Sequence, residues 1–449
     1  MIKKLFGTDG IRGTSNQGVM TADISLKLGA AIGTVFNRRH KKNLVVIGKD
    51  TRLSGYLLEP AITSGFISVG TDVLLVGPMP TPAISMLIKS LRADMGIMIS
   101  ASHNPYHDNG IKVFDANGIK LEKSLETEIE KIIAEYPNNI EFASPDQLGR
   151  AKRLDDAPGR YIEFAKSTFP KTQTLKNLKI VIDSANGAAY HVAEKIFWEL
   201  GAEIISIENK PDGFNINKNC GSTHPENLQK IVVEHKADLG IALDGDADRL
   251  ILVDNEGQLI NGDKIIAVIA LHFQKLNKLK DNIVVTTHMS NISLEAFLKQ
   301  HNIILHRADV GDKFVYREII KNNLSLGGEQ SGHIIIPEFC STGDGIIAAL
   351  QVLASFIASD KNTLSEFFDI YTDTPQILYN IPIKSTTSLE SPSVNEAIKK
   401  VKSKLGALGR VLIRKSGTEP LIRVMIEHPD IATINQSLES IKTEILKCH

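Results

Sequence analysis

The sequence predicts an α/β protein: three similar α/β domains on mixed sheets rich in parallel strands, followed by a smaller α+β C-terminal domain. The first observation is a faint internal repeat, in which an apolar strand, a polar loop and an amphipathic helix follow one another from residues 44, 180 and 283. Strands that alternate with helices favour parallel pairing, with helices on both faces of the sheet. The second observation is the length of 449 residues, which is too long for one core and suggests about three or four domains.

Breaks in the strand and helix pattern place the domain boundaries near residues 153, 255 and 371. Charged or turn-forming stretches interrupt the pattern at these points. We therefore predict domains over 1–153, 154–255, 256–370 and 371–449. In the last domain the pattern predicts a strand over 377–383, a helix over 393–405, strands over 411–413 and 421–426, and a helix over 433–447.

Composition narrows the class of protein. The formal net charge is −1, which provides no basic excess for nucleic acid or an anionic membrane, so we expect neither partner. The cysteines are odd in number, widely spaced and without a Cys-x-x-Cys pair, which indicates reduced thiols in packing roles: Cys220, Cys340 and Cys448. The N-terminus has no apolar signal-peptide core, and the longest apolar stretch, 345–358, predicts a buried helix too short for a membrane span. We expect a cytoplasmic protein that acts on small molecules.

One loop, residues 100–105 with the sequence Ser-Ala-Ser-His-Asn-Pro, follows a predicted buried strand over 95–99. Asp108-Asn109-Gly110 predicts a turn before another strand over 111–114. Ser102 therefore lies at a strand end, where α/β proteins usually place their chemistry. A serine is a weak nucleophile without a base or a metal, His103 is only its chain neighbour, and a G-x-S-x-G elbow is absent. Alone, the segment is more typical of a polar loop.

Three carboxylates, Asp244, Asp246 and Asp248, stand at alternate positions between predicted strands over 239–243 and 250–253. Two like charges about 4 Å apart repel by roughly 4 kcal/mol at an effective dielectric of 20, so such a trio needs a cation. Oxygen ligands suit a hard ion such as Mg²⁺. An EF-hand calcium loop needs Gly and Glu where this chain has Arg249 and Asn255. A solvated acidic turn is the other alternative, and the apolar flanks count against it.

Two further loops carry groups suited to a polyhydroxylated or anionic ligand. Residues 327–333, Gly-Gly-Glu-Gln-Ser-Gly-His, offer small residues for a close approach and several hydrogen-bonding side chains. Residues 414–420, Arg-Lys-Ser-Gly-Thr-Glu-Pro, offer consecutive amides that can form an anion-binding nest. Arg414 and Arg423 add fork-shaped donors that match a phosphate. A solvated hairpin tip is an equal alternative for this last loop.

Together and in this order, the four segments resemble the α-D-phosphohexomutase superfamily. The resemblance runs from Phe-Gly-Thr-Asp-Gly-Ile-Arg-Gly at 6–13 to the 414–420 loop, essentially the whole chain. It implies four domains and an enzyme, an intramolecular phosphotransferase that interconverts hexose 6-phosphates and 1-phosphates. Gln330 stands where similar phosphomannomutases and phosphoglucomutases usually carry Met, and with residues 220–223 and 341–345 it favours glucosamine phosphates as substrates. Such an enzyme would supply amino sugar for UDP-N-acetylglucosamine and cell-wall synthesis.

The resemblance also implies roles for individual residues. Phosphorylated Ser102 would exchange its phosphoryl group with the sugar through glucosamine 1,6-bisphosphate, with this compound or glucose 1,6-bisphosphate as activator. One Mg²⁺ would be held by a phosphoserine oxygen of Ser102 and by Asp244, Asp246 and Asp248. The groups expected to assist catalysis are Arg12, His103, Arg249 and Lys112, the last as acid/base or charge stabiliser. The groups expected to bind substrate are Lys313, Glu329, Ser331, His333, Arg414, Ser416, Gly417, Thr418 and Arg423. Many relatives carry Arg at position 313, and Lys cannot make a bidentate contact.

Alternatives remain open at this point. The nearest is phosphomannomutase or phosphoglucomutase activity within the same superfamily. A metal-dependent sugar phosphatase would use the same aspartates and release phosphate to water. A sugar-phosphate binding protein would keep the 414–420 loop and lose the nucleophile, whereas Ser102 and the three aspartates are all present. We expect a monomer or a homodimer.

Overall fold

The computed structural model describes residues 4–7, 9–36, 42–383, 389, 391–415 and 421–447. The chain divides into two compact units. The first contains residues 1–287 and 308–368, and the second contains residues 288–307 and 369–449.

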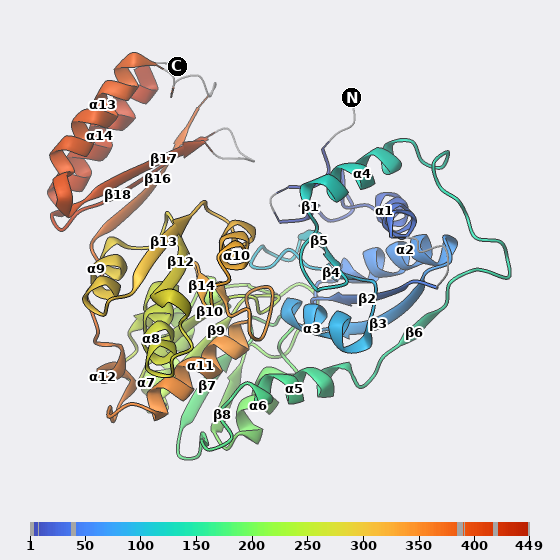
Figure 1. Ribbon diagram of the computed structural model, residues 1–449, viewed down its shortest axis with the longest axis horizontal. Helices are drawn as coiled ribbons and strands as arrows, with labels where there is room; N and C mark the ends of the chain where they lie inside the picture. Colours follow the sequence, from blue (N-terminus) through green and yellow to red (C-terminus); the bar gives the residue numbers. More distant parts are fainter. Residues whose placement is uncertain are drawn as a thin grey trace. The chain divides into compact units, whose positions relative to one another are not determined.

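The N-terminal part of the first unit is built on a six-stranded mixed sheet ordered β1-β5-β4-β2-β3-β6 (Figure 1). Four neighbouring strands, β4, β2, β3 and β6, run parallel, whereas β5 pairs antiparallel with β4 and with β1. The strands are β1 (Ile11–Thr14), β2 (Leu44–Lys49), β3 (Asp72–Pro78), β4 (Met95–Ile99), β5 (Asp108–Asp115) and β6 (Ala151–Arg153).

Helices cover both faces of this sheet. α1 (Ala22–Val35), α2 (Gly55–Ser68) and α4 (Lys123–Ala134) share one hydrophobic core with strand residues such as Val45 and Ile97. α3 (Thr81–Leu91) packs on the opposite face, where Gly48 and Gly96 have no side chain. A Cβ at either glycine would lie 2.3 Å from an isoleucine of α3. Because side chains alternate along a strand, these glycines let α3 approach closely without disturbing the other helix layer.

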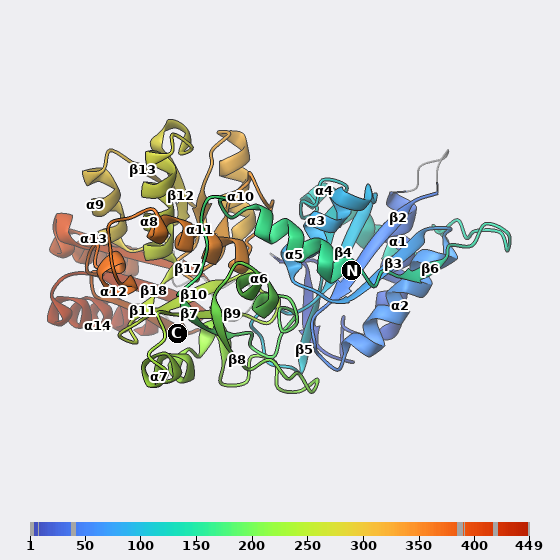
Figure 2. The same ribbon diagram turned by 90° about the horizontal axis from the view of Figure 1, so that it is seen from below.

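A five-stranded mixed sheet follows, ordered β11-β10-β9-β7-β8. Its strands are β7 (Lys179–Asp183), β8 (Glu203–Ile207), β9 (Leu239–Leu243), β10 (Leu250–Asp254) and β11 (Leu259–Ile260). β7 pairs in parallel with β8 and β9, whereas β9, β10 and β11 form an antiparallel edge; β7, β9 and β10 lie side by side in both views (Figure 1, Figure 2). α7 (Glu226–Glu234) packs on this sheet through Leu228 and Val232, and α11 (Gly345–Ile357) is buried along almost its whole length.

The third group of strands in the first unit is β12 (Ile283–Thr287), β14 (Gly327–Gly328) and β15 (Ile334–Ile335). β12 pairs in parallel with β14, which pairs antiparallel with β15. α10 (Asp312–Lys321) shares a small core with these strands through Val315 and Ile319. The remaining helices of this unit are α5 (Ala157–Ser167), α6 (Ala193–Glu199), α8 (Gly262–Lys275) and α12 (Leu364–Phe368).

The second unit contains α9 (Ile292–Gln300) and most of β13 (Ile304–Ala308), together with a small α+β domain. The domain has an antiparallel sheet ordered β16-β18-β17, made of β16 (Gln376–Pro382), β17 (Arg410–Lys415) and β18 (Leu421–Glu427). α13 (Pro392–Leu405) and α14 (Ile431–Lys447) lie side by side against it (Figure 1). Their apolar stripes, such as Val394 with Val401 and Ile434 with Ile441, form the core with Val424 of the sheet.

The predicted fold class is confirmed: mixed sheets rich in parallel strands precede a smaller α+β domain. The prediction of a turn at Asp108-Asn109-Gly110 is wrong, because these residues begin β5 and pair with residues 12–14 of β1. A Cβ on Gly110 would lie 2.5 Å from the carbonyl oxygen of Ser100. This glycine therefore allows close backbone packing beside the 100–105 loop, not a change of chain direction.

Other predictions concern the cysteines, the long apolar stretch and the domain boundaries. Cys220 and Cys340 are buried free thiols, and Cys448 lies outside the described residues. The predicted helix over 345–358 is α11. In the described part of the chain, no helix combines the length and the apolar character needed to cross a membrane. The three predicted domain boundaries stay predictions.

Candidate active site

The carboxyl ends of β2 and β4 position the first part of the site. These strands are parallel neighbours with Lys49 opposite Ile99, so the loops that follow them start side by side. Ser102 lies in the second loop, is only 2% exposed and has a φ of 53°. Its hydroxyl donates a hydrogen bond of 2.6 Å to Oδ2 of Asp244. The structure thus brings together two residues that the sequence analysis assigned separately.

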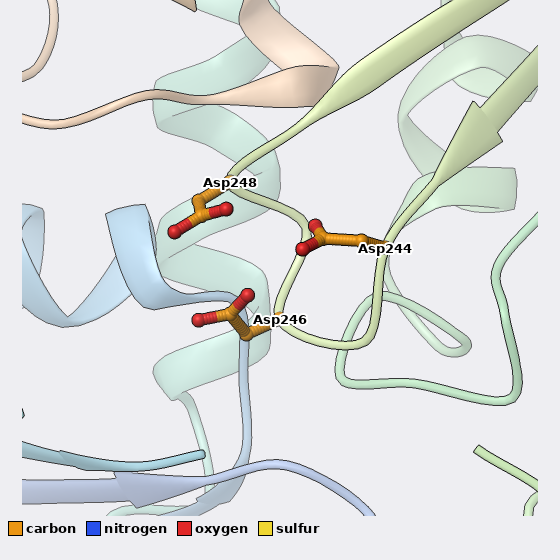
Figure 3. A group of neighbouring side chains, drawn as sticks. All are labelled: Asp244, Asp246 and Asp248. Atoms are coloured by element: carbon orange, nitrogen blue, oxygen red, sulfur yellow. The ribbon is translucent and has the colours of Figure 1, made fainter. Parts of the chain in front are cut away.

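The three aspartates lie on the tight connection between β9 and β10, two antiparallel strands whose pairing closes at Leu243 and Leu250. Each offers a carboxylate oxygen within 4.8 Å of the others, and the side chains point toward one another (Figure 3). All three are buried, and the Oδ1 atoms of Asp246 and Asp248 have no hydrogen-bond partner among the residues that the structure describes. Burial, Asp248 and Asp246 together raise the pKa of Asp244 to about 8. Buried carboxylate oxygens with unused lone pairs are the donor set that a hard cation prefers, so these residues fit Mg²⁺.

Lys112, on β5, faces the same carboxylates. Its Nζ donates to Oδ2 of Asp246 at 2.7 Å and to Oδ2 of Asp248 at 3.0 Å, and it lies 3.7 Å from Oδ2 of Asp9. Burial lowers the pKa of Lys112, but Asp246, Asp248 and Asp9 outweigh burial and hold this pKa well above its ordinary value. Lys112 is therefore a buried ammonium ion that balances part of the charge of the trio.

A ring of charged side chains and one histidine, here called the charge ring, extends from this lysine. Lys120 bridges Asp9 and Asp312, whose Oδ2 lies 3.6 Å from Nε2 of His333. Nδ1 of His333 lies 3.6 Å from Oδ1 of Asp248, which closes the ring. Burial lowers the pKa of Lys120, but Asp312 and Asp9 raise it above its ordinary value. Asp9 lies in the 6–13 motif, but no role was predicted for Asp9 or Asp312 from the sequence, and nothing in the local sequence distinguishes Lys120 from a surface lysine.

Three predicted helpers lie close to these carboxylates. Burial, with Arg249 and Arg12 nearby, lowers the pKa of His103 to about 4, so His103 is neutral near pH 7. The guanidinium of Arg12 is bound to Asp9. The backbone N–H of Arg249 donates to Oδ1 of Asp244 at 3.2 Å. A neutral histidine near two arginines can accept or donate a hydrogen bond without adding a third positive charge.

The predicted sugar-binding loop forms the turn of the β14–β15 hairpin. Glu329 Oε1 accepts a hydrogen bond from the Gly311 N–H at 3.2 Å, which holds the segment that carries Lys313 beside it. Ser331 is exposed at the tip. His333 is 3% exposed, and its Nε2 accepts from the Gly343 N–H at 2.9 Å, so Nδ1 is the nitrogen that carries hydrogen toward Asp248. His333 thus faces protein groups through both ring nitrogens, a geometry that suits orientation of Asp248.

A cavity of about 390 Å³ lies beside this charge ring. Among its lining residues are Lys112, Lys120, Asp312 and Lys313. Its size is within the usual range for small-ligand sites. The lining lysines supply positive charge for an anionic ligand.

In the second unit, Arg414 on β17 lies directly opposite Arg423 on β18. Side chains at opposite positions of an antiparallel pair are close neighbours, so two guanidinium groups share one face. Such a pair suits a phosphate. Ser416, Gly417 and Thr418, predicted to bind the same phosphate, lie outside the described residues.

Four family profiles match almost the whole chain. The profiles described as phosphoglucomutase/phosphomannomutase alpha/beta/alpha domains I, II and III match residues 3–139, 159–257 and 261–374, and the C-terminal domain profile matches residues 378–443. The chain therefore belongs to the phosphoglucomutase/phosphomannomutase family.

Individual relatives narrow the comparison. The chain is 53% identical over 446 residues to phosphoglucosamine mutase of Paramagnetospirillum magneticum, covering 98% of each chain. It is 54% identical over 433 residues to phosphoglucosamine mutase of Granulibacter bethesdensis, covering 96% of this chain and 94% of the relative. Among solved structures, a phosphoglucomutase/phosphomannomutase family protein from Burkholderia thailandensis superposes with a TM-score of 0.81 at 24% identity, covering 99% of this chain and 98% of the other. N-acetylphosphoglucosamine mutase of Aspergillus fumigatus superposes with a TM-score of 0.68 at 18% identity, covering 98% and 95%. The structural matches show the shared fold.

Proposed function

We propose that this protein interconverts glucosamine 6-phosphate and glucosamine 1-phosphate. The observation that carries the proposal is the contact between Ser102 and the buried aspartates, which places a hydroxyl nucleophile 2.6 Å from a carboxylate suited to a metal. The names of relatives more than 50% identical over nearly the whole chain support the choice of sugar. Sequence similarity of this extent, with Ser102 and all three aspartates present, also favours catalysis over binding alone.

The reaction would use a phosphoserine at position 102. The phosphorus–Oγ bond breaks as phosphorus bonds to the free hydroxyl oxygen of the sugar phosphate, and the proton of that hydroxyl ends on Oγ of Ser102, giving glucosamine 1,6-bisphosphate and a free serine. The bisphosphate turns over and returns its other phosphoryl group to Ser102. Lys112, an ammonium ion with a raised pKa, is better suited to stabilise charge on the moving phosphoryl group than to remove a proton. His103, Arg12 and Arg249 would donate hydrogen bonds to the same oxygens.

Asp244, Asp246 and Asp248, with an oxygen of phosphorylated Ser102, would hold Mg²⁺. When bound, this ion neutralises charge on the transferring phosphoryl group. The chain's own residues prepare the site, because Thr81 Oγ1 and Lys112 both donate to Oδ2 of Asp246 and leave Oδ1 available. That arrangement orients the carboxylate before any ligand arrives.

The remaining site residues would hold the substrate. Glu329 and Ser331 bind sugar hydroxyls, with Lys313 and His333 beside them. The 414–420 loop and Arg423 bind the phosphate that does not react. Because the bisphosphate is held in two orientations, this phosphate-binding site must accept the phosphate of either end of the sugar.

A comparison of kcat/KM on glucosamine 6-phosphate, glucose 6-phosphate and mannose 6-phosphate, with glucose 1,6-bisphosphate as activator, tests the proposal. We expect the largest kcat/KM on glucosamine 6-phosphate. A larger value for mannose or glucose 6-phosphate would assign the protein to phosphomannomutase or phosphoglucomutase activity. Release of inorganic phosphate without an isomer would indicate a phosphatase.

A further inference from the structure

Four hydrogen bonds of the Arg52 guanidinium go to backbone carbonyls in and just after the loop that carries Ser102, and a fifth goes to Asp50. Nη2 donates to the carbonyl oxygens of Ser102 at 2.9 Å and of Asn104 at 2.8 Å. Nη1 donates to the carbonyl oxygens of Pro105 and Asp108. Nε donates to Oδ2 of Asp50 at 2.8 Å. Arginine has five N–H donors, so the side chain is fully used, and it is 1% exposed.

Asp50 holds the other side of the same residue. Its Oδ2 accepts a hydrogen bond of 2.6 Å from the Ser100 hydroxyl, whose oxygen accepts from the Ser102 N–H at 2.9 Å. The Asp50 backbone N–H donates to the carbonyl of Ile99 at 3.0 Å, which fixes Asp50 beside the start of the loop. Both backbone groups of Ser102 are therefore tied to one buried ion pair, the N–H through Ser100 and the carbonyl through Arg52.

The conformation of Ser102 explains why such restraint is needed. Its φ of 53° lies in the left-handed region, which residues with a Cβ occupy only when their surroundings impose it. This conformation accompanies the direction of its Oγ toward Asp244. Within the described part of the chain, the side-chain hydrogen bonds of Asp50 and Arg52 reach the Ser102 loop and its flanks and not Asp244, Asp246 or Asp248, so the pair acts on the nucleophile and not on the carboxylates.

We infer that the Asp50–Arg52 ion pair is a positioning device that fixes Ser102, and the phosphate it carries, in line for transfer to the sugar. The inference rests on the proposed phosphoserine function. If the loop loosens, water can replace the sugar hydroxyl: a water oxygen bonds to phosphorus, the phosphorus–Oγ bond breaks, and one proton of water returns to Oγ as inorganic phosphate leaves. Loss of positioning should therefore slow transfer to the sugar and shorten the lifetime of the phosphoserine.

The test compares Arg52→Ala and Arg52→Lys with the unmodified protein after phosphorylation by glucose 1,6-bisphosphate. Misplacing a reacting group by about 1 Å can cost roughly 100-fold, so we expect kcat of Arg52→Ala to fall by about 10- to 100-fold. The KM for glucosamine 6-phosphate and the affinity for Mg²⁺ should stay within about threefold, because Arg52 contacts neither. Loss of phosphate from Ser102 without sugar, followed by intact-protein mass spectrometry, should be faster than in the unmodified protein.

Two further measurements separate positioning from stability. Arg52→Lys should have a kcat and a phosphoserine lifetime between those of Arg52→Ala and the unmodified protein, since lysine cannot reach all four carbonyls. Guanidinium ion at millimolar concentration should partly restore the kcat of Arg52→Ala. Ser100→Ala breaks only the link to the Ser102 N–H. We expect it to lower kcat and to shorten the lifetime of the phosphoserine, in both cases less than Arg52→Ala does. This variant keeps the test decisive if Arg52→Ala does not fold. The matched control is Asp94→Ala, which removes the carboxylate that accepts from the Leu44 N–H at the opposite end of β2.

The outcomes are distinct. Folded Arg52→Ala and Ser100→Ala with unchanged kcat and unchanged phosphoserine lifetime would overturn the positioning role. Equal acceleration of phosphate loss in Asp94→Ala would overturn it as well, because any destabilisation of β2 would then suffice. An unmodified protein that never carries phosphate on Ser102 would overturn the proposed function itself.

Discussion

Ser102 and Asp244 are 142 positions apart in the chain, yet the hydroxyl of one donates to the carboxylate of the other across 2.6 Å. The contact is possible because the loop after β4 and the β9–β10 connection meet: a Cβ on Gly245 would lie 2.5 Å from the Ser102 carbonyl oxygen. A phosphate on Ser102 would add negative charge beside three buried carboxylates. Lys112 balances only part of that charge, so a bound cation would stabilise the arrangement, which links the nucleophile to the metal requirement.

The first prediction is that Ser102→Ala abolishes mutase turnover and leaves the fold intact, because a loop hydroxyl contributes little to the core. Intact-protein and peptide mass spectrometry of active protein should find the phosphate on Ser102. Ser355→Ala, which removes a buried hydroxyl that donates to the Val268 carbonyl, is the control and should retain activity. Full activity of Ser102→Ala, or phosphate on another residue, would contradict the prediction.

The second prediction concerns the metal. Chelation should abolish turnover and Mg²⁺ should restore it, and Asp246→Asn should lower turnover by roughly 100-fold or more, since metal ions supply several kcal/mol of charge stabilisation. Thermal unfolding in chelator should change little in this variant, because repulsion among the carboxylates is relieved as one ligand is lost. Mg²⁺ should raise the unfolding temperature of the unmodified protein and not that of Asp246→Asn.

The control for this prediction is Asp254→Asn, a buried aspartate at the other end of the same hairpin. Its Oδ1 accepts from the N–H groups of Glu256 and Gln258 at 2.9 Å, contacts that asparagine can keep. This variant should respond to Mg²⁺ like the unmodified protein. Activity that persists after exhaustive chelation would rule the metal role out.

Local sequence was sufficient for several strands and for the clustering of the three aspartates. The apolar runs at 95–99 and 239–243 are strands β4 and β9 with the predicted ends, and the alternating aspartates point to one spot because the connection between β9 and β10 is short. Local sequence was insufficient for Arg52, because its bonds to the Ser102 loop exist only if β2 and β4 are neighbours. The state of Lys112 could not be predicted from local sequence either, because only the fold shows that it is a buried ammonium ion.

The third prediction concerns pH. Burial raises the pKa of Asp344 from 3.8 to about 6, even though the carboxylate accepts from two N–H groups and from Tyr161. A carboxyl group whose folded-state pKa is raised favours folding at low pH, and this contribution is lost as pH rises from about 4 to about 6. At most about 3 kcal/mol of stability is involved.

Asp344→Asn should remove the loss of stability between about pH 4 and pH 6, because an amide keeps the acceptor oxygen at the start of α11 and never ionises. The unfolding temperature of the variant, relative to the unmodified protein, should rise between pH 4 and pH 6 and then stay constant. Tyr161→Phe is the comparison and should be destabilised by about 1–3 kcal/mol, because it removes a buried donor. A difference between Asp344→Asn and the unmodified protein that does not vary with pH would refute the assignment.

The last prediction separates binding of the unreacting phosphate from phosphoryl transfer. If glucosamine 1,6-bisphosphate turns over in the site, one phosphate-binding site must hold the unreacting phosphate in both orientations. Arg414 should therefore contribute to substrate binding in both reaction directions. Arg414→Ala should weaken sugar-phosphate binding by about 1.5–3 kcal/mol, the range for a hydrogen bond to a charged group. It should leave Mg²⁺ affinity nearly unchanged, because the aspartates lie on a different segment of the chain. Lys404→Ala removes an exposed cation of the same small domain, bound to Gln436, and should leave binding in both directions unaltered. Initial rates from glucosamine 6-phosphate and from glucosamine 1-phosphate, measured with a Mg²⁺ titration, test this prediction. A loss of binding confined to one direction, or a loss of metal affinity, would falsify the model of one phosphate-binding site for both directions.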